Sequence, residues 1–314
     1  MIKKRAFLFI IAAGVFWGTS GIFVHFMAPY GFSSLQMTAV RGTVSFLSMA
    51  IFLLCGQPSL FRASIRELLL YAGCGLGFFG TAACYYAAMQ IAGVSTAVML
   101  MYTAPVLVML YSVLFLGERF TLLKGVSVLC MLVGCAFVSG VIGGIRFEGL
   151  GILLGFLSAL FYAAYNVFTK IALRRGATAK TVTLYTFLFM AGAAVVSCRP
   201  TEIVTHAAKA PIAVLALSVG LGIVTSVLPY FLYALALREL PAGTASALSI
   251  VEPMAATLFS VLLFRERLRF YSCIGILLIL LAVILLSRAD EKNGKKASRV
   301  RSEAICENVT RNQD

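Results

Sequence analysis

The sequence predicts an all-α integral membrane protein in which ten transmembrane helices form two inverted five-helix repeats. Three observations predict this fold class: an apolar composition, ten apolar runs of membrane-spanning length, and a second half that repeats the first. Of the 314 residues, 61% are hydrophobic and 12% are charged, and the mean hydropathy is +0.97. Soluble domains carry about 25% charged residues, so the composition excludes a soluble globular protein.

Ten apolar runs follow one another along the chain, separated by short connections that often contain glycine or proline. Each run is close to the ~20 residues that a hydrocarbon core of ~30 Å requires. The first run resembles a signal peptide but continues without a cleavage signature, so we expect it to be retained as a span. The expected spans are residues 6–27, 33–54, 68–90, 94–116, 122–140, 148–169, 181–198, 211–236, 243–264 and 270–287.

The spans divide the chain into three parts. Residues 1–145 contain the first five spans, and residues 146–287 contain the second five. Residues 288–314 are polar and low in apolar side chains, a composition that cannot bury enough surface to fold. We expect them to form a disordered cytoplasmic tail.

An internal repeat relates the fourth span to the ninth. Residues 88–119, placed over residues 236–267 without gaps, are identical at eleven of thirty-two positions. Pro105 of the first copy matches Pro253 of the second, and we expect both to bend their helices because proline leaves a backbone carbonyl unpaired. Five spans per half is an odd number, so the two halves must cross the membrane in opposite orientations. Inverted repeats are typical of secondary transporters, whose substrate sites lie near the midplane between the repeats.

The distribution of lysine and arginine predicts the orientation. If the N-terminus is inside, the inner segments before the tail carry 12 Lys and Arg residues and the outer loops carry 6. The positive-inside rule therefore favours both termini in the cytoplasm. We expect a multi-pass protein of the cytoplasmic cell membrane.

Two charged residues lie deep within the predicted spans, Glu252 in the ninth and Arg41 in the second. A charge at the bilayer centre costs about 2.5–3.5 kcal/mol on the insertion scale, so both should face the bundle interior or water. At ~1.5 Å per residue, both lie near mid-depth. Two alternatives stay open: the two residues pair for structural reasons, or Glu252 takes a proton or holds a substrate amine.

Aromatic and polar side chains recur on single faces of several spans. Tyr162, Tyr165 and Asn166 share one face of the sixth span at helical spacing. Such side chains suit a cavity for a partly apolar zwitterion, although they also pack membrane helices together. The candidate substrate-binding residues are Trp17, Tyr85, Tyr102, Tyr162, Tyr165, Asn166, Tyr233, Ser249 and Glu252.

The sequence contains none of the motifs that bind nucleotides or catalyse reactions. It has no Walker A, HExxH or CxxC pattern, and its eight cysteines show no metal-ligand spacing. The net charge of +14 comes from loops and the tail, where the positive-inside rule accounts for it. We therefore expect no enzyme, no cofactor, no metal site, no ATP and no nucleic-acid partner.

Four segments together resemble the EamA-like branch of the drug/metabolite transporter superfamily. They are FWGTSGIF (16–23), Arg41 in the second span, TAPVLVMLYSVLFLGERF (103–120) and SIVEPMAATLFSVLLFRERL (249–268). The resemblance covers about residues 6–287, and the second copy departs from the pattern by carrying Arg265 where the first has Gly117. It implies ten helices in two five-helix repeats and export of small metabolites or amino acids by alternating access.

These observations favour a secondary transporter that exports small metabolites, with amino acids or related amphipathic solutes as the cargo. The alternative of the same class is a multidrug or organic-cation extruder, with proton coupling through Glu252. An intramembrane enzyme would need a catalytic dyad or metal ligands, and a membrane scaffold would need a filled apolar midplane. The expected partners are a small-molecule substrate and the lipid bilayer, and a homodimer stays open.

Overall fold

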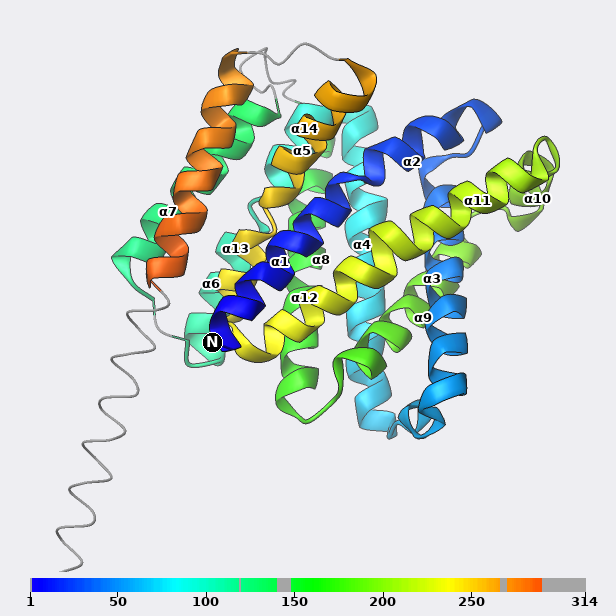
Figure 1. The fold of residues 1–314 in the computed structure, drawn as a ribbon, viewed down its shortest axis with the longest axis horizontal. Helices are drawn as coiled ribbons and strands as arrows, with labels where there is room; N and C mark the ends of the chain where they lie inside the picture. The colour runs from blue at the N-terminus through cyan, green and yellow to red at the C-terminus, as the bar shows by residue number, and fades with distance from the viewer. Residues whose placement is uncertain (1, 119, 140–147, 266–269, 290–314) are drawn as a thin grey trace, which may run out of the picture.

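The computed structural model describes residues 2–118, 120–139, 148–265 and 270–289 (Figure 1). Within these ranges every regular element is helical, nine helical segments are long and apolar enough to span a membrane, and a shorter apolar helix covers Leu122–Val138. The predicted ten-helix fold is confirmed. Arg288 and Ala289, which we expected in the disordered tail, belong to the final helix, and the rest of the expected tail lies outside the described residues.

The first half contains five spans built from seven α-helices. The first span is α1 (Ile2–Gly18) followed by α2 (Ser20–Met27) and the short η1 (Ala28–Tyr30). The rest of the half comprises α3 (Ser34–Gly56), η2 (Pro58–Phe61), α4 (Ile65–Ala92), α5 (Val94–Met101), α6 (Ala104–Phe115) and α7 (Leu122–Val138).

The second half begins with α8 and ends with a final helix over Phe270–Ala289. Its eighth span is α11, the π-helical turn η4 and α12 in one continuous run. The elements before the final helix are α8 (Gly149–Arg174), α9 (Ala179–Ser197), α10 (Pro200–Ala208), α11 (Pro211–Gly222), η4 (Ile223–Val227), α12 (Leu228–Glu239), α13 (Ala242–Leu248) and α14 (Val251–Phe264).

Capping residues explain several helix starts. Ser33 and Ser64 each accept a hydrogen bond from the backbone N–H three residues later, and the side chains of Gln36 and Glu67 bond back to the two cap residues. These reciprocal bonds satisfy backbone donors that have no partner within the helix. They begin α3 and α4 where the sequence predicts the second and third spans.

The fourth and ninth spans are both interrupted, at equivalent places. The fourth stops at Met101 and resumes at Ala104, and the ninth stops at Leu248 and resumes at Val251. Pro105 and Pro253 lie in the first turns of the second segments, α6 and α14. Neither proline can donate to the carbonyl four residues earlier, so the two helices break where the repeat predicts a bend.

Close helix crossings assemble the core. Helix α4 packs against α8 and α9, α3 packs against α9, and α1 packs against α12. A Cβ atom added to Gly75 of α4 would lie 2.5 Å from Phe189 Cβ and 2.7 Å from the Thr186 carbonyl oxygen of α9. The glycine therefore permits a helix approach that no larger residue allows.

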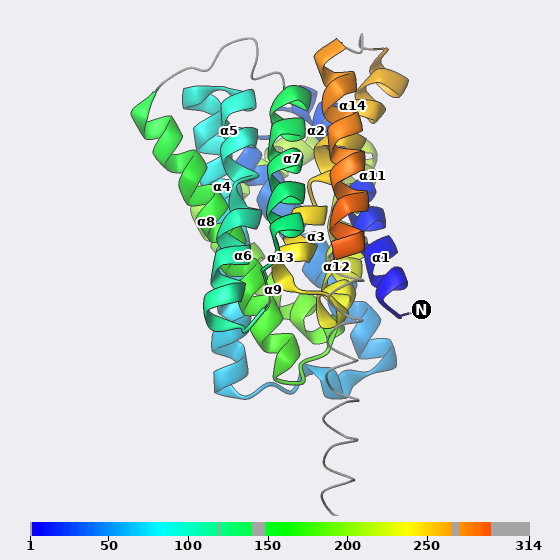
Figure 2. The same ribbon diagram turned by 90° about the vertical axis from the view of Figure 1, so that its left-hand side faces the viewer.

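Helix α7 and the final helix stand together at the left side of the molecule in Figure 1, and this side faces the viewer in Figure 2. They meet at two glycines, because a Cβ on Gly275 would lie 2.5 Å from the carbonyl oxygen of Gly134. Leu129 and Leu277 are 62% and 66% exposed. This peripheral position agrees with the almost wholly apolar sequences of the fifth and tenth spans.

The N-terminus and the end of the final helix lie at the same end of the molecule (Figure 2). The connections α3–α4, α6–α7, α8–α9 and α12–α13 reach this end too, and we call it the terminal end. The connections α2–α3, α4–α5 and α9–α10 lie at the opposite, distal end (Figure 1). The spans thus alternate in direction along the described chain.

Candidate functional site

A cavity of about 350 Å³ lies among seven of the ten spans. Its size is within the range of small-molecule sites. Aromatic, hydroxyl and charged side chains are mixed with apolar ones along its wall. The polar and aromatic residues that line it are Trp17, Ser20, Arg41, Phe78, Thr81, Tyr85, Tyr86, Tyr102, Tyr162, Tyr230 and Glu252.

Five of the nine residues predicted to bind substrate line this cavity, and Arg41 lines it too. They are Trp17, Tyr85, Tyr102, Tyr162 and Glu252. The helix break in the ninth span brings Pro253 to the same wall. Pro105, its repeat mate, is buried in α6 and does not line the cavity.

The other four predicted residues, Tyr165, Asn166, Tyr233 and Ser249, are fully buried and form a second layer behind the wall. The Tyr162 hydroxyl donates to Ser249 Oγ at 3.3 Å, and Asn166 Nδ2 donates to the Tyr162 carbonyl at 2.7 Å. The Tyr233 hydroxyl donates to Asn166 Oδ1, and its ring lies 5.4 Å from the Trp17 ring. These residues orient Tyr162 and Trp17 and have no surface on the cavity.

Arg41 is held by the π-helical turn of the eighth span. Its Nη2 donates to the Thr225 carbonyl at 2.8 Å, and its Nε donates to Ser226 Oγ. In an α-helix the Thr225 carbonyl would accept from residue 229, but that residue is proline and has no N–H. The missing N–H of Pro229 therefore leaves the Thr225 carbonyl available to bind the guanidinium.

Aromatic rings cover the Arg41 guanidinium. Its central carbon lies 5.6 Å from the Phe78 ring centroid and 5.9 Å from that of Tyr230. Both contacts are within the range of cation–π attraction, which strengthens where water is excluded. Hydrogen bonds and rings together stabilise a charge that the membrane interior would otherwise disfavour.

Glu252 occupies the first turn of α14. The N-terminus of a helix carries a partial positive charge, which favours a carboxylate there. Tyr102 and Arg41 are among the side chains that interact with this carboxylate electrostatically. Its position at an interrupted membrane helix is the arrangement that transporters use to place charges near the midplane.

Arg41 and Glu252 line one cavity without forming an ion pair, within the residues that the structure describes. Two nitrogens of Arg41, Nε and Nη2, donate hydrogen bonds to the eighth span, and its Nη1 makes no hydrogen bond to any described residue. The cavity therefore presents an anionic and a cationic group that a ligand can contact separately.

Sequence reasoning missed Phe78, Tyr86 and Tyr230 as wall residues. Tyr230 packs against Trp17, Phe78 and Tyr165, with its ring centroid 4.9 Å from that of Trp17. One signal was available, because Tyr230 lies three residues before Tyr233 and shares its helix face. The position of Phe78 depends on the rotation of α4, which the sequence does not specify.

The cavity lies toward the distal end. Its residues come from the distal half of α4, from α2 and α5, from the middle of α8, and from the first turns of α12 and α14 (Figure 1). Gly21 and Val24 on its rim are exposed. Toward the terminal end, Tyr233, Leu237 and Leu248 are completely buried, so packed side chains close that end.

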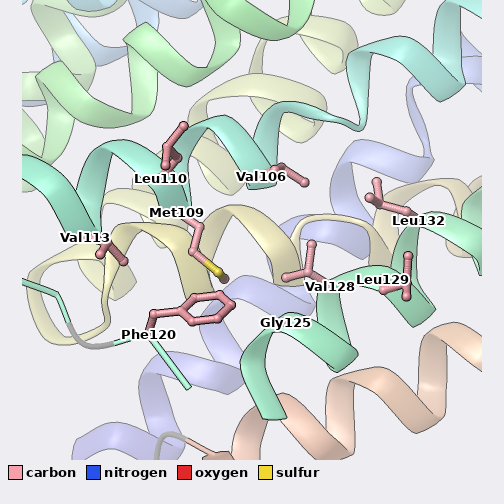
Figure 3. Close-up of a pocket in the computed structure, with 9 residues that line it drawn as sticks. All are labelled: Val106, Met109, Leu110, Val113, Phe120, Gly125, Val128, Leu129 and Leu132. Atoms are coloured by element: carbon pink, nitrogen blue, oxygen red, sulfur yellow. The ribbon is translucent and has the colours of Figure 1, made fainter. Parts of the chain in front are cut away.

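A second pocket, of about 520 Å³, lies between α6 and α7 (Figure 3). All nine residues that line it are apolar or glycine, among them Met109, Phe120 and Leu129. Leu110 and Leu129 are largely exposed on the surface of the bundle. No polar group is available there to orient a solute, so this groove is not the candidate transport site. Within the described ranges, no cluster of His, Cys, Asp or Glu could hold a metal ion.

Within the described residues, ten spans in two repeats surround a cavity that carries polar and charged groups, and this arrangement defines a membrane transporter. The chain belongs to the EamA-like transporter family, whose model matches residues 4–140 and again residues 149–288. The two matches correspond to the two halves of the structure.

Similar curated proteins are also described as transporters. An uncharacterized transporter of Archaeoglobus fulgidus is 29% identical over 281 residues, which cover 89% of this chain and 95% of the relative. The uncharacterized transporter YwfM of Bacillus subtilis is 24% identical, over 91% of this chain and 94% of its own. A crystal structure of 21% identity superposes with a TM-score of 0.76, over 92% of this chain and 99% of that one, and this likeness concerns the fold.

Proposed function

We propose that this transporter exports amino acids or related small amphipathic solutes across the cytoplasmic membrane by alternating access. The observation that carries the proposal is the composition of one cavity. Glu252, Arg41 and a set of aromatic rings all line it. A cavity that holds both charges of a zwitterion and an apolar wall between them matches this class of solute.

The geometry supports a defined orientation for the cargo. The ammonium group of the solute would lie at Glu252, close to the rings of Tyr85, Tyr102 and Tyr162. Its carboxylate would accept from Arg41, whose Nη1 makes no hydrogen bond within the described residues. Guanidinium and carboxylate groups form strong charge-assisted hydrogen bonds, and the rings provide cation–π contact and apolar surface.

The access of the cavity indicates which state of the proposed cycle the structure represents. The charge count predicts that the terminal end is cytoplasmic, so a cavity near the distal end faces outward. The present conformation is then the one that releases cargo, and rocking of the two halves around the cavity would expose it to the cytoplasm.

One observation favours the alternative of an organic-cation extruder. Glu252 lies among tyrosine rings, and a carboxylate with aromatic rings is the usual recognition site for ammonium groups. In that case Glu252 would exchange a proton for the cation. The presence of Arg41 on the same wall opposes this alternative, because a like charge disfavours a monocationic ligand.

A set of three matched solutes separates the two functions. Phenylalanine, phenethylamine and phenylpropionate share a ring and differ only in which charged groups they carry. In proteoliposomes we expect transport of the amino acid, and a decrease of at least about tenfold for Glu252→Gln, because one charge partner is lost. Transport of the amine alone would establish the cation extruder. If no member of a wider amino-acid and amine panel moves, the proposed cargo is wrong.

A further inference from the structure

Charged side chains gather at the closed, terminal end of the molecule, away from the cavity. Lys170 and Arg174 lie in the last turns of α8, and Glu118 lies in the connection between α6 and α7. All three contact either the turn between α12 and α13 or one another. The cavity does not use them.

Lys170 binds the end of α12. Its side chain is only 6% exposed, and its Nζ donates to the carbonyl of Leu240 at 2.6 Å and to that of Leu237. The last carbonyls of a helix have no partner within it, and the negative end of the helix dipole attracts a cation. The ammonium therefore holds α12 against α8.

Glu118 binds the start of α13. Its Oε1 accepts from the backbone N–H of Ala242 at 2.9 Å and lies 3.8 Å from Arg174 Nη2. Arg174 Nη1 also donates to the Leu116 carbonyl at 3.0 Å. Glu118 belongs to the first half of the chain and Ala242, in the first turn of α13, to the second, so this carboxylate links the two halves.

We propose that Lys170 and Glu118 form a latch that closes the terminal end of the transport path and opens once in each cycle. The turn that they hold, Leu240–Ala242, links α12 and α13, and Leu237 and Leu248 of these helices form the buried layer below the cavity. A movement of this turn away from α8 would open that layer. The inference rests on the alternating access proposed above and adds the groups that control it.

The residue equivalent to Lys170 in the first repeat lies at the distal end and forms no such latch with the described residues. The shift of 145 that aligns the first span with the sixth places His25 in the position of Lys170. His25 is exposed and makes no hydrogen bond to any described residue, and its ring lies 5.4 Å from the Phe26 ring and 4.5 Å from the Phe264 ring. One end is therefore held by hydrogen bonds from charged groups, while the corresponding residue at the end near the cavity makes no such bond within the described part of the chain.

Cysteine labelling without cargo tests the latch. In a full-length chain with its native cysteines replaced, Met89→Cys reports on the cavity wall and Leu248→Cys on the buried layer beneath it. An impermeant maleimide is added to proteoliposomes from either side. Lys170→Met should increase labelling of residue 248 from the terminal side about tenfold, because it removes a charged hydrogen-bond donor, and should slow labelling of residue 89 from the distal side.

Matched variants keep the test decisive. Arg238→Met removes an exposed cation near the same turn, and its labelling at residues 89 and 248 should equal that of the parent. Lys170→Arg keeps a charged hydrogen-bond donor, so its labelling should stay close to that of the parent. If Lys170→Met fails to insert, Glu118→Ala must give the same increase at residue 248. Unchanged labelling from both sides in the variant that inserts would overturn the latch. Because no cargo is present, a failed substrate panel does not affect this result.

Discussion

At the scale of single residues, Arg41 shows how distant positions cooperate to hold a charge in the membrane. Pro229 removes the backbone donor that an α-helix would offer to the Thr225 carbonyl, and the guanidinium of Arg41 binds this carbonyl. Ser226 supplies a second acceptor. Each of these residues is ordinary alone, and the site exists only because the second and eighth spans lie side by side.

Arg41→Ala should destabilise the protein in detergent by about 1–3 kcal/mol, because it leaves the Thr225 carbonyl and Ser226 hydroxyl without their partner. Arg41→Lys should lose less stability, since an ammonium group can still donate a hydrogen bond to either the Thr225 carbonyl or the Ser226 hydroxyl. Thermal unfolding of the purified variants at matched detergent concentration measures both effects. Equal melting temperatures for Arg41→Ala and the parent would contradict the anchoring role.

Glu252→Gln should insert normally and abolish either the recognition of the ammonium group or the pH dependence of transport. The amide has the same shape as the acid, but it can neither carry the charge nor exchange a proton. Transport is measured against pH at matched expression, with Glu148→Gln, an exposed carboxylate at the start of α8, as the control. Identical rates and pH profiles for Glu252→Gln and the parent would show that this carboxylate is structural.

At the scale of helices, interruptions and close crossings have different roles. The breaks at Pro105 and Pro253 turn two spans into pairs of shorter helices and bring the N-terminus of α14 to the cavity. The glycines of α4 instead permit continuous helices to approach closely. Gly75 meets Phe189 and Thr186 of α9, and Gly77 lies close to the backbone of α8 at Phe161 and Tyr165.

Gly75→Ala should lower the stability by about 1–3 kcal/mol, because its methyl group would overlap atoms of α9 and force the two helices apart. Gly192→Ala on α9 provides the matched control. An added Cβ there meets nothing within 4 Å, so the change should be neutral or stabilise the helix by up to about 1 kcal/mol. Thermal unfolding distinguishes the two, and equal effects would argue against a close α4–α9 crossing.

At the scale of the whole molecule, two halves of similar sequence surround a cavity that is closed at only one end. Buried apolar side chains, together with Lys170 and Glu118, close the terminal end. The distal rim at Gly21 and Val24 is exposed. An asymmetric conformation of a repeated sequence is what an alternating-access cycle requires.

The topology predicts opposite labelling of two exposed residues. The connection after α8 lies at the terminal end and contains the exposed Arg175, whereas α10 lies at the distal end and contains the exposed Thr205 (Figure 1). In intact cells, a cysteine at residue 205 should react with an impermeant maleimide, whereas one at residue 175 should react only after permeabilisation. Reaction of both from the same side would contradict the alternation of the spans, and the reverse pattern would invert the orientation predicted from the charge count.

The sequence alone determined the spans, the helix breaks and the two charges at depth. Apolar length reports membrane crossing because the bilayer has a fixed thickness, and proline acts on the backbone of its own helix. The depth of Glu252 and Arg41 follows from counting residues along a helix. These features are local, so they can be inferred without the tertiary structure.

Only the tertiary structure decided which rings face the cavity and which support them. Tyr162 and Tyr165 share a helix face, yet Tyr162 lines the cavity and Tyr165 lies behind it. Tyr230 lines the wall, whereas its neighbour Tyr233 is completely buried. Helix rotation and crossing angle determine these positions, and both arise from packing between spans far apart in the chain. For the same reason, only the structure joins Lys170 and Glu118 to the turn between α12 and α13.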